Sequence, residues 1–207
     1  MTIEEFYLSQ LRQVLLGQST LDDVEAACLE RLSTRTQKQR DEEQARLRPC
    51  RSALSIGGLL KHVTYGMRGA TARLAGTEPA RTSIDDAAYA QYMGSFALTD
   101  DETAAGVLAE FDAVRTDYLA AVRATDPEAA TVEPPSPWFG IHDARPANAR
   151  YYLVHQIEEM ARHAGHADIL REEIDAMQVP AIQLSLEGMP ANDFFQPYVP
   201  TPGTLGA

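Results

Sequence analysis

The chain has 207 residues, of which 44% are hydrophobic and 23% are charged, and its formal net charge is −12. This length suits one domain with a sizeable core, so we expect residues 1–207 to form a single domain. The strong acidity disfavours binding to nucleic-acid phosphates and to anionic membranes. No run of 18 apolar residues exists, and the amino terminus is acidic and amphipathic. The sequence therefore predicts a cytoplasmic protein without membrane contact.

The two cysteines, Cys28 and Cys50, are too few for a disulfide framework and do not have CxxC spacing. Paired cysteines of a redox or zinc motif lie close together in sequence. We expect both thiols to be reduced and structural.

The first half of the chain predicts three helices. Apolar residues recur at spacings of three and four over residues 3–16, and the segment 20–47 contains neither Pro nor Gly, which favours a long helix. After a short connector over residues 52–58, a third helix is expected to begin at Leu59 and to end at Gly76. His62 lies on this third helix among apolar residues, where a buried and hydrogen-bonded histidine is the alternative to a metal ligand.

The middle of the chain predicts one long loop and one helix. Residues 77–98 contain Pro79 and Gly94, and we expect a loop whose aromatic residues could cover the mouth of a site; these are Tyr89, Tyr92 and Phe96. Thr99 and Glu102 have the spacing of a capping box. A helix is expected to follow them.

The remaining connections carry many prolines. Residues 126–146 contain five prolines and the only tryptophan, which predicts a loop. Residues 178–207 predict an extended tail that packs on the bundle through Phe194, Phe195 and Tyr198. Amphipathic helices with hardly any alternating pattern indicate an all-α bundle with its core over about residues 20–177.

The segment Tyr151–Asp175 concentrates titratable residues on one predicted helix. At about 100° per residue, four side chains fall within roughly 80° of one another around the helix axis; they are His155, Glu159, His163 and His166. Glu159 and His163 are four residues apart, so a carboxylate oxygen and an imidazole nitrogen can bind one ion. A solvated Glu–His pair without metal is the common alternative. The density of histidines, together with His62 on another apolar helix, favours metal.

Two segments resemble the signature segments of the DinB-like metalloenzyme superfamily: SALSIGGLLKHVTY at 52–65 and LVHQIEEMARHAGHADILREEID at 153–175. The resemblance implies a four-helix bundle with a long crossover and a divalent metal held by three side chains. Carried over to this chain, the ligands are His62, Glu159 and His163. Zinc is the expected ion, and nickel, iron and manganese are alternatives that this donor set also accepts.

Four further residues are expected around the ligands. His166 is expected to orient a ligand, or else to pair with Asp168 or Glu172, and His155 to line the mouth of the pocket. Arg162 and Tyr65 are expected to contact the ligands or line the pocket.

The resemblance also implies a reaction class. Relatives activate a low-molecular-weight thiol, mycothiol or bacillithiol, so we expect a thiol-dependent S-transferase or isomerase that acts on a small electrophile. The alternatives are a metal-dependent hydrolase and a non-catalytic metal- or ligand-binding stress-response protein. The chain contains neither HExxH nor GxSxG, so a metalloprotease or a serine hydrolase is not indicated. The expected partner is a small-molecule substrate, and a homodimer is an alternative to a monomer.

Overall fold

The computed structural model describes residues 42–77 and 84–199. Over these residues the chain is mostly helical, which confirms the all-α prediction. The predicted helix over residues 3–16 and most of that over 20–47 lie outside the described residues, as does Cys28. The described end of the second is α3, Glu42–Arg46, and Cys50 is a half-buried free thiol.

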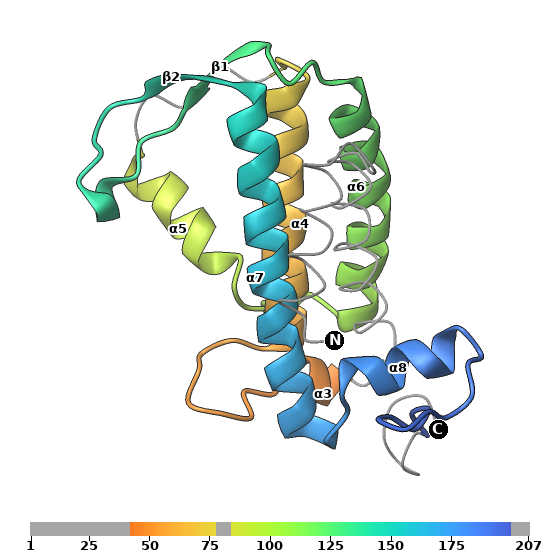
Figure 1. Cartoon of the computed structure of the whole chain (residues 1–207). Helices are drawn as coiled ribbons and strands as arrows, with labels where there is room; N and C mark the ends of the chain where they lie inside the picture. The colour runs from red at the N-terminus through yellow and green to blue at the C-terminus, as the bar shows by residue number, and fades with distance from the viewer. Residues whose placement is uncertain (1–41, 78–83, 200–207) are drawn as a thin grey trace.

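Three long helices form the described part of the bundle: α4 (Ile56–Leu74), α6 (Ala104–Ala124) and α7 (Ala149–Asp175). α4 packs against both α6 and α7, and the three lie side by side (Figure 1). Their shared core contains large side chains with almost no exposed surface, among them Leu59, Met67, Phe111 and Tyr118. Burying such side chains stabilises the fold by about 1.5–3 kcal/mol each. Within the described residues, no helix is long and apolar enough to cross a membrane.

The helices begin at different residues from those predicted because the capping residues differ. α4 begins at Ile56, three residues early, since the hydroxyl of Ser55 accepts a hydrogen bond from the Gly58 amide at 3.1 Å. α6 begins at Ala104 with Thr103 as its N-cap. The Thr99 amide does bind the Glu102 carboxylate, at 2.7 Å, but this bond closes a turn before the helix and does not cap it.

The predicted loop over residues 77–98 contains a helix, so that prediction was wrong in part. α5 spans Asp86–Gly94, and its N-cap Asp85 accepts a hydrogen bond from the Ala88 amide at 2.7 Å. None of the residues of α5 is buried. The apolar periodicity that reveals a packed helix is therefore absent from this segment.

The predicted loop over residues 126–146 contains a short sheet, which was not expected. β1 (Ala130–Glu133) pairs antiparallel with β2 (Arg145–Asn148), and Ala130 lies opposite Asn148. A turn of 3₁₀ helix, η1 (Pro137–Phe139), lies between them. The pair sits at the end of the bundle where α7 begins (Figure 1).

The carboxy-terminal segment was predicted to be extended, and this was wrong over α8, Val179–Leu186. The following chain returns to α8, where the Tyr198 amide donates to the Ala181 carbonyl at 2.9 Å. Phe194 is 85% exposed, so it does not pack on the bundle as expected. Phe195 and Tyr198 are half-buried.

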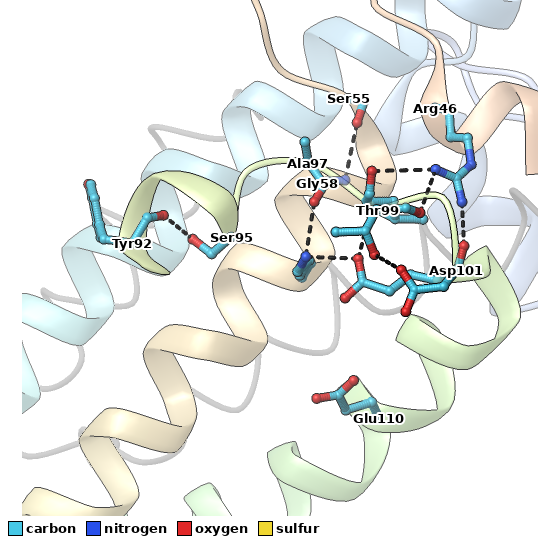
Figure 2. A network of polar contacts seen from close by, with 12 residues as sticks. Arg46, Ser55, Gly58, Tyr92, Ser95, Ala97, Thr99, Asp101 and Glu110 are labelled. Carbon is cyan, nitrogen blue, oxygen red and sulfur yellow. Dashed lines mark hydrogen bonds and ion pairs between the residues drawn. The ribbon is translucent and has the colours of Figure 1, made fainter. Parts of the chain in front are cut away.

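Residues 95–103, which we call the crossing segment, run from α5 to α6 across the first turns of α4 (Figure 2). Two glycines of α4 make room for this passage. A Cβ added to Gly58 would lie 2.8 Å from the carbonyl carbon of Phe96, and one added to Gly57 would lie 2.7 Å from Cδ1 of Leu98. Real Cβ atoms essentially never approach other atoms this closely. The path of the segment depends on glycine at position 58, where the close atoms are backbone, whereas the end of the Leu98 side chain could shift away from a Cβ at position 57.

Two basic side chains fasten the crossing segment to the bundle. Lys61 of α4 donates to the Ala97 carbonyl at 3.0 Å and forms an ion pair with the Glu102 carboxylate at 2.8 Å. Arg46 of α3 donates to the Thr99 carbonyl at 3.1 Å and also to the Glu102 carbonyl (Figure 2). These bonds, of which those to Ala97 and Glu102 are partly buried, hold the segment in one position over α4.

Candidate metal centre

The structure brings together three side chains that the sequence singled out. His62 of α4 meets Glu159 and His163 of α7, and one possible ligand atom from each lies within 4.8 Å of the others. His62 and His163 are 7% and 6% exposed, whereas the Glu159 side chain is 28% exposed. The cluster is therefore closed on the imidazole side and open on the carboxylate side.

The donor set of this cluster fits a divalent ion. Two imidazoles and one carboxylate hold the ion in many zinc enzymes, where a further coordination position stays open for the reacting group. The two residues of α7 are one helical turn apart, and Nε2 of His163 lies 3.3 Å from Oε2 of Glu159. The hydrogen bond from His163 lowers the pKa of Glu159, so this carboxyl is ionised at neutral pH. An ionised carboxylate and an imidazole that point at each other can share one cation.

His62 is enclosed by aromatic rings. Its ring stacks on Phe96 at a centroid distance of 3.8 Å and an interplanar angle of 17°, and it meets the edge of Tyr92 at 5.5 Å. Burial lowers the pKa of His62 to about 4, with a smaller contribution from His163 in the same direction and an opposing one from Glu159. The ring is therefore neutral at pH 7, which is the form that binds metal.

The side chain of Ser95 contacts His62 directly, and sequence reasoning missed it. Its Oγ lies 2.8 Å from Nδ1 of His62, and Ser95 is only 3% exposed. The contact spans 33 residues of sequence and depends on the path of the crossing segment. Of the three aromatics expected to cover a site, Tyr92 and Phe96 lie against His62, whereas Tyr89 is 53% exposed.

The structure places His166 beside His163, one turn further along α7. Their Nδ1 atoms are 3.4 Å apart, and burial lowers the pKa of His166. A neutral imidazole here can accept a hydrogen bond from Nδ1 of His163. In that tautomer Nε2 of His163 carries no hydrogen and does not donate to Glu159, so its lone pair is free to bind a cation together with the carboxylate. This arrangement favours the expectation that His166 orients a ligand.

Arg162 lies near the open side of the cluster. The guanidinium of Arg162 is 2.9 Å from the carboxylate of Glu158 and 3.9 Å from that of Glu159. Burial raises the pKa of the Tyr92 hydroxyl, and Glu159 and Tyr65 add to this in the same direction. Tyr65 is half-buried on α4, one turn beyond His62, and its expected contact with the ligands stays a prediction.

His155 contacts residues other than the three potential ligands. Its ring stacks parallel to Tyr151 at 6.2 Å, and its Nδ1 lies 3.7 Å from Glu158. It lines a shallow surface hollow whose other residues are Asn148, Arg150, Tyr151, Val154 and Glu158. None of the three potential ligands lines that hollow.

The packed helices and the His62, Glu159 and His163 cluster define an all-α bundle of the DinB-like class with a candidate metal centre. The profile of the Mycothiol-S-transferase family matches residues 29–176. The chain therefore belongs to the mycothiol S-transferase family, within the DinB-like superfamily. No curated protein matches the chain.

Proposed function

We propose that this protein is a divalent-metal-dependent enzyme that joins a low-molecular-weight thiol, mycothiol, to a small electrophilic substrate or isomerises such a substrate with the help of the thiol. One observation carries the proposal. The segment that matches the Mycothiol-S-transferase family contains all three residues of the cluster. Those residues come from two helices and lie together, and their side chains are of the types that hold a catalytic divalent ion.

In this proposal His62, Glu159 and His163 hold the ion, and zinc is the expected metal. A bound divalent ion lowers the pKa of a coordinated thiol or water, which supplies the nucleophile at neutral pH. The residues around the proposed ion have different roles. Phe96 shields the buried side of His62 from water, while the partly exposed Glu159 and the guanidinium of Arg162 line the side from which thiol and substrate would enter.

The transfer itself needs no further cofactor. With a chlorinated electrophile, a carbon–sulfur bond forms as the carbon–chlorine bond breaks, and the thiol proton and chloride leave. With an epoxide, the ring carbon–oxygen bond breaks and the alkoxide takes up the proton that the thiol lost. The site must therefore lower the pKa of the thiol and admit a small electrophile, and both demands fit an open carboxylate side beside two buried imidazoles.

The test compares the purified protein with two variants that each lose one histidine. Elemental analysis measures the bound metal, and mass spectrometry detects the conjugate formed from mycothiol and a chlorinated or epoxide compound. We expect conjugate from the zinc-loaded parent and none after chelation or in His163→Ala. His142→Ala removes an exposed histidine outside the cluster and should behave as the parent does.

Two outcomes would overturn the proposal in different ways. A protein that binds zinc but forms no conjugate with any electrophile would be a metal- or ligand-binding protein. A protein that consumes the electrophile equally well without thiol, and releases the hydrolysed compound, would be a metal-dependent hydrolase.

The domain organisation, location and partners are also proposals. We propose that residues 1–207 act as one domain in the cytoplasm on a small molecule, as a monomer or a homodimer. The net charge of −12 supports the absence of a nucleic-acid partner, because phosphates repel an acidic surface.

A further inference from the structure

The hydroxyl group of Ser95 forms two short polar contacts, and only one arrangement of protons satisfies both. Oγ lies 2.6 Å from the carbonyl oxygen of Tyr92 (Figure 2) and 2.8 Å from Nδ1 of His62. A carbonyl oxygen can only accept, so the single hydroxyl hydrogen of Ser95 is donated to Tyr92. Oγ is then left as an acceptor towards His62, and Nδ1 of His62 must carry the hydrogen of that bond.

A neutral imidazole has one N–H, and its position decides which nitrogen can bind a metal. With the hydrogen on Nδ1, the lone pair of His62 is on Nε2. Two further contacts support this arrangement, one at the His62 ring and one at Ser95. The Phe96 ring stacks on it at 3.8 Å, and the Ser95 amide donates to the Gln91 carbonyl at 3.1 Å at the end of α5, which fixes the position of the hydroxyl.

We propose that Ser95 is a positioning residue that holds His62 in the tautomer protonated on Nδ1, so that Nε2 is the atom offered to the metal. This inference rests on the proposed metal site and adds a residue that acts on it through His62. The crossing segment brings Ser95 to this place, so the metal centre depends on a third element beside α4 and α7. His166 has the matching geometry towards Nδ1 of His163, so both imidazoles would bind through Nε2.

The test reads the tautomer first, in the chelator-treated protein. Long-range ¹H–¹⁵N correlation spectra at pH 7.5 distinguish the two neutral forms of histidine, and the His62→Gln variant identifies the signals of His62. We expect Nδ1 to be protonated in the parent and in Ser95→Thr, which keeps a hydroxyl. Ser95→Ala should show a mixture of both tautomers.

The second reading is the zinc affinity of the same proteins, measured by competition with a chelating dye. Loss of a group that orients a ligand lowers metal affinity about 10- to 100-fold, so this loss is expected for Ser95→Ala, with recovery in Ser95→Thr. Thr64→Val is the matched control. Thr64 is 2% exposed on α4, and its hydroxyl donates to the Leu60 carbonyl at 2.8 Å. The Thr64→Val variant therefore loses a buried hydroxyl whose hydrogen bond goes to Leu60 and not to His62. It should keep the zinc affinity of the parent.

The inference is wrong if His62 of the parent carries its proton on Nε2, or if Ser95→Ala leaves the tautomer unchanged. It is also wrong if Thr64→Val loses as much zinc affinity as Ser95→Ala, because the loss would then reflect general destabilisation. Failure of the proposed function looks different. A parent that binds no zinc, but in which Ser95 still controls the tautomer of His62, would remove the metal role and leave the positioning intact.

Discussion

Replacing Gly58 with alanine should destabilise the protein even though alanine is the better helix former. A Cβ at this position would lie 2.8 Å from the carbonyl carbon of Phe96, and ordinary contact begins at 3.4 Å. The carbonyl oxygen of Phe96 would lie closer still, so the crossing segment must move by more than about 0.6 Å. Overpacking against backbone atoms should therefore cost about 3 kcal/mol, the upper end of the usual range. Alanine returns about 1 kcal/mol through helix propensity. With a cost at the upper end of the overpacking range, we expect a net loss of about 2 kcal/mol.

Urea unfolding measures this loss, and Gly69→Ala is its control on the same helix. No atom of the residues that the structure describes lies within 4 Å of a Cβ added to Gly69, so this variant should gain up to about 1 kcal/mol from propensity alone. The displacement in Gly58→Ala should also draw Ser95 and Phe96 away from His62 and lower zinc affinity. If Gly58→Ala were as stable as Gly69→Ala, the close passage of the crossing segment over α4 would be refuted.

Three further predictions follow from charge and burial. Because burial lowers the folded-state pKa of His62 from 6.5 to about 4, the unfolded chain takes up this proton first as pH falls. The metal-free protein should then lose up to about 3 kcal/mol of unfolding free energy between pH 6.5 and 4, and equal pH slopes in urea unfolding of parent and His62→Gln would contradict this. Lys61→Met should cost about 1–2 kcal/mol by leaving the partly buried Ala97 carbonyl unbonded. Arg68→Met, which removes an exposed ion pair, should cost under about 0.5 kcal/mol. Equal losses on thermal melting would argue against the role of Lys61 in holding the crossing segment. Gel-shift assays with duplex DNA at physiological salt should show no retardation, because the net charge is −12, and a clear shift would overturn that expectation.

The long helices and the three potential metal ligands could be predicted because their signals are local. Glu159 and His163 are four residues apart on one helix, and His62 stands out as a histidine in an apolar segment. Packing α4 against α7 then brings the three together, as bundle architecture generally does for inward-facing residues.

The elements that the sequence did not predict are those without a local signal. α5 has no buried residue, so it shows no apolar stripe. β1 alternates over only four residues, and β2 contains Pro146 and does not alternate, so neither strand carries a clear signal. Pro180 lies in the first turn of α8, where proline is compatible with a helix start. The contact between Ser95 and His62 depends on how the crossing segment passes Gly58, which is a property of tertiary packing.

The most direct test of the metal centre is the zinc affinity of the parent beside three single variants, measured by calorimetric titration of the chelator-treated protein. We predict one ion per chain in the parent, and in His163→Ala a loss well beyond the roughly 10- to 100-fold expected for His166→Ala, since only the former removes a ligand. Glu159→Gln should also bind zinc much more weakly. Equal losses in His163→Ala and His166→Ala, or a Glu159→Gln variant that binds zinc as tightly as the parent does, would contradict the proposed ligand set.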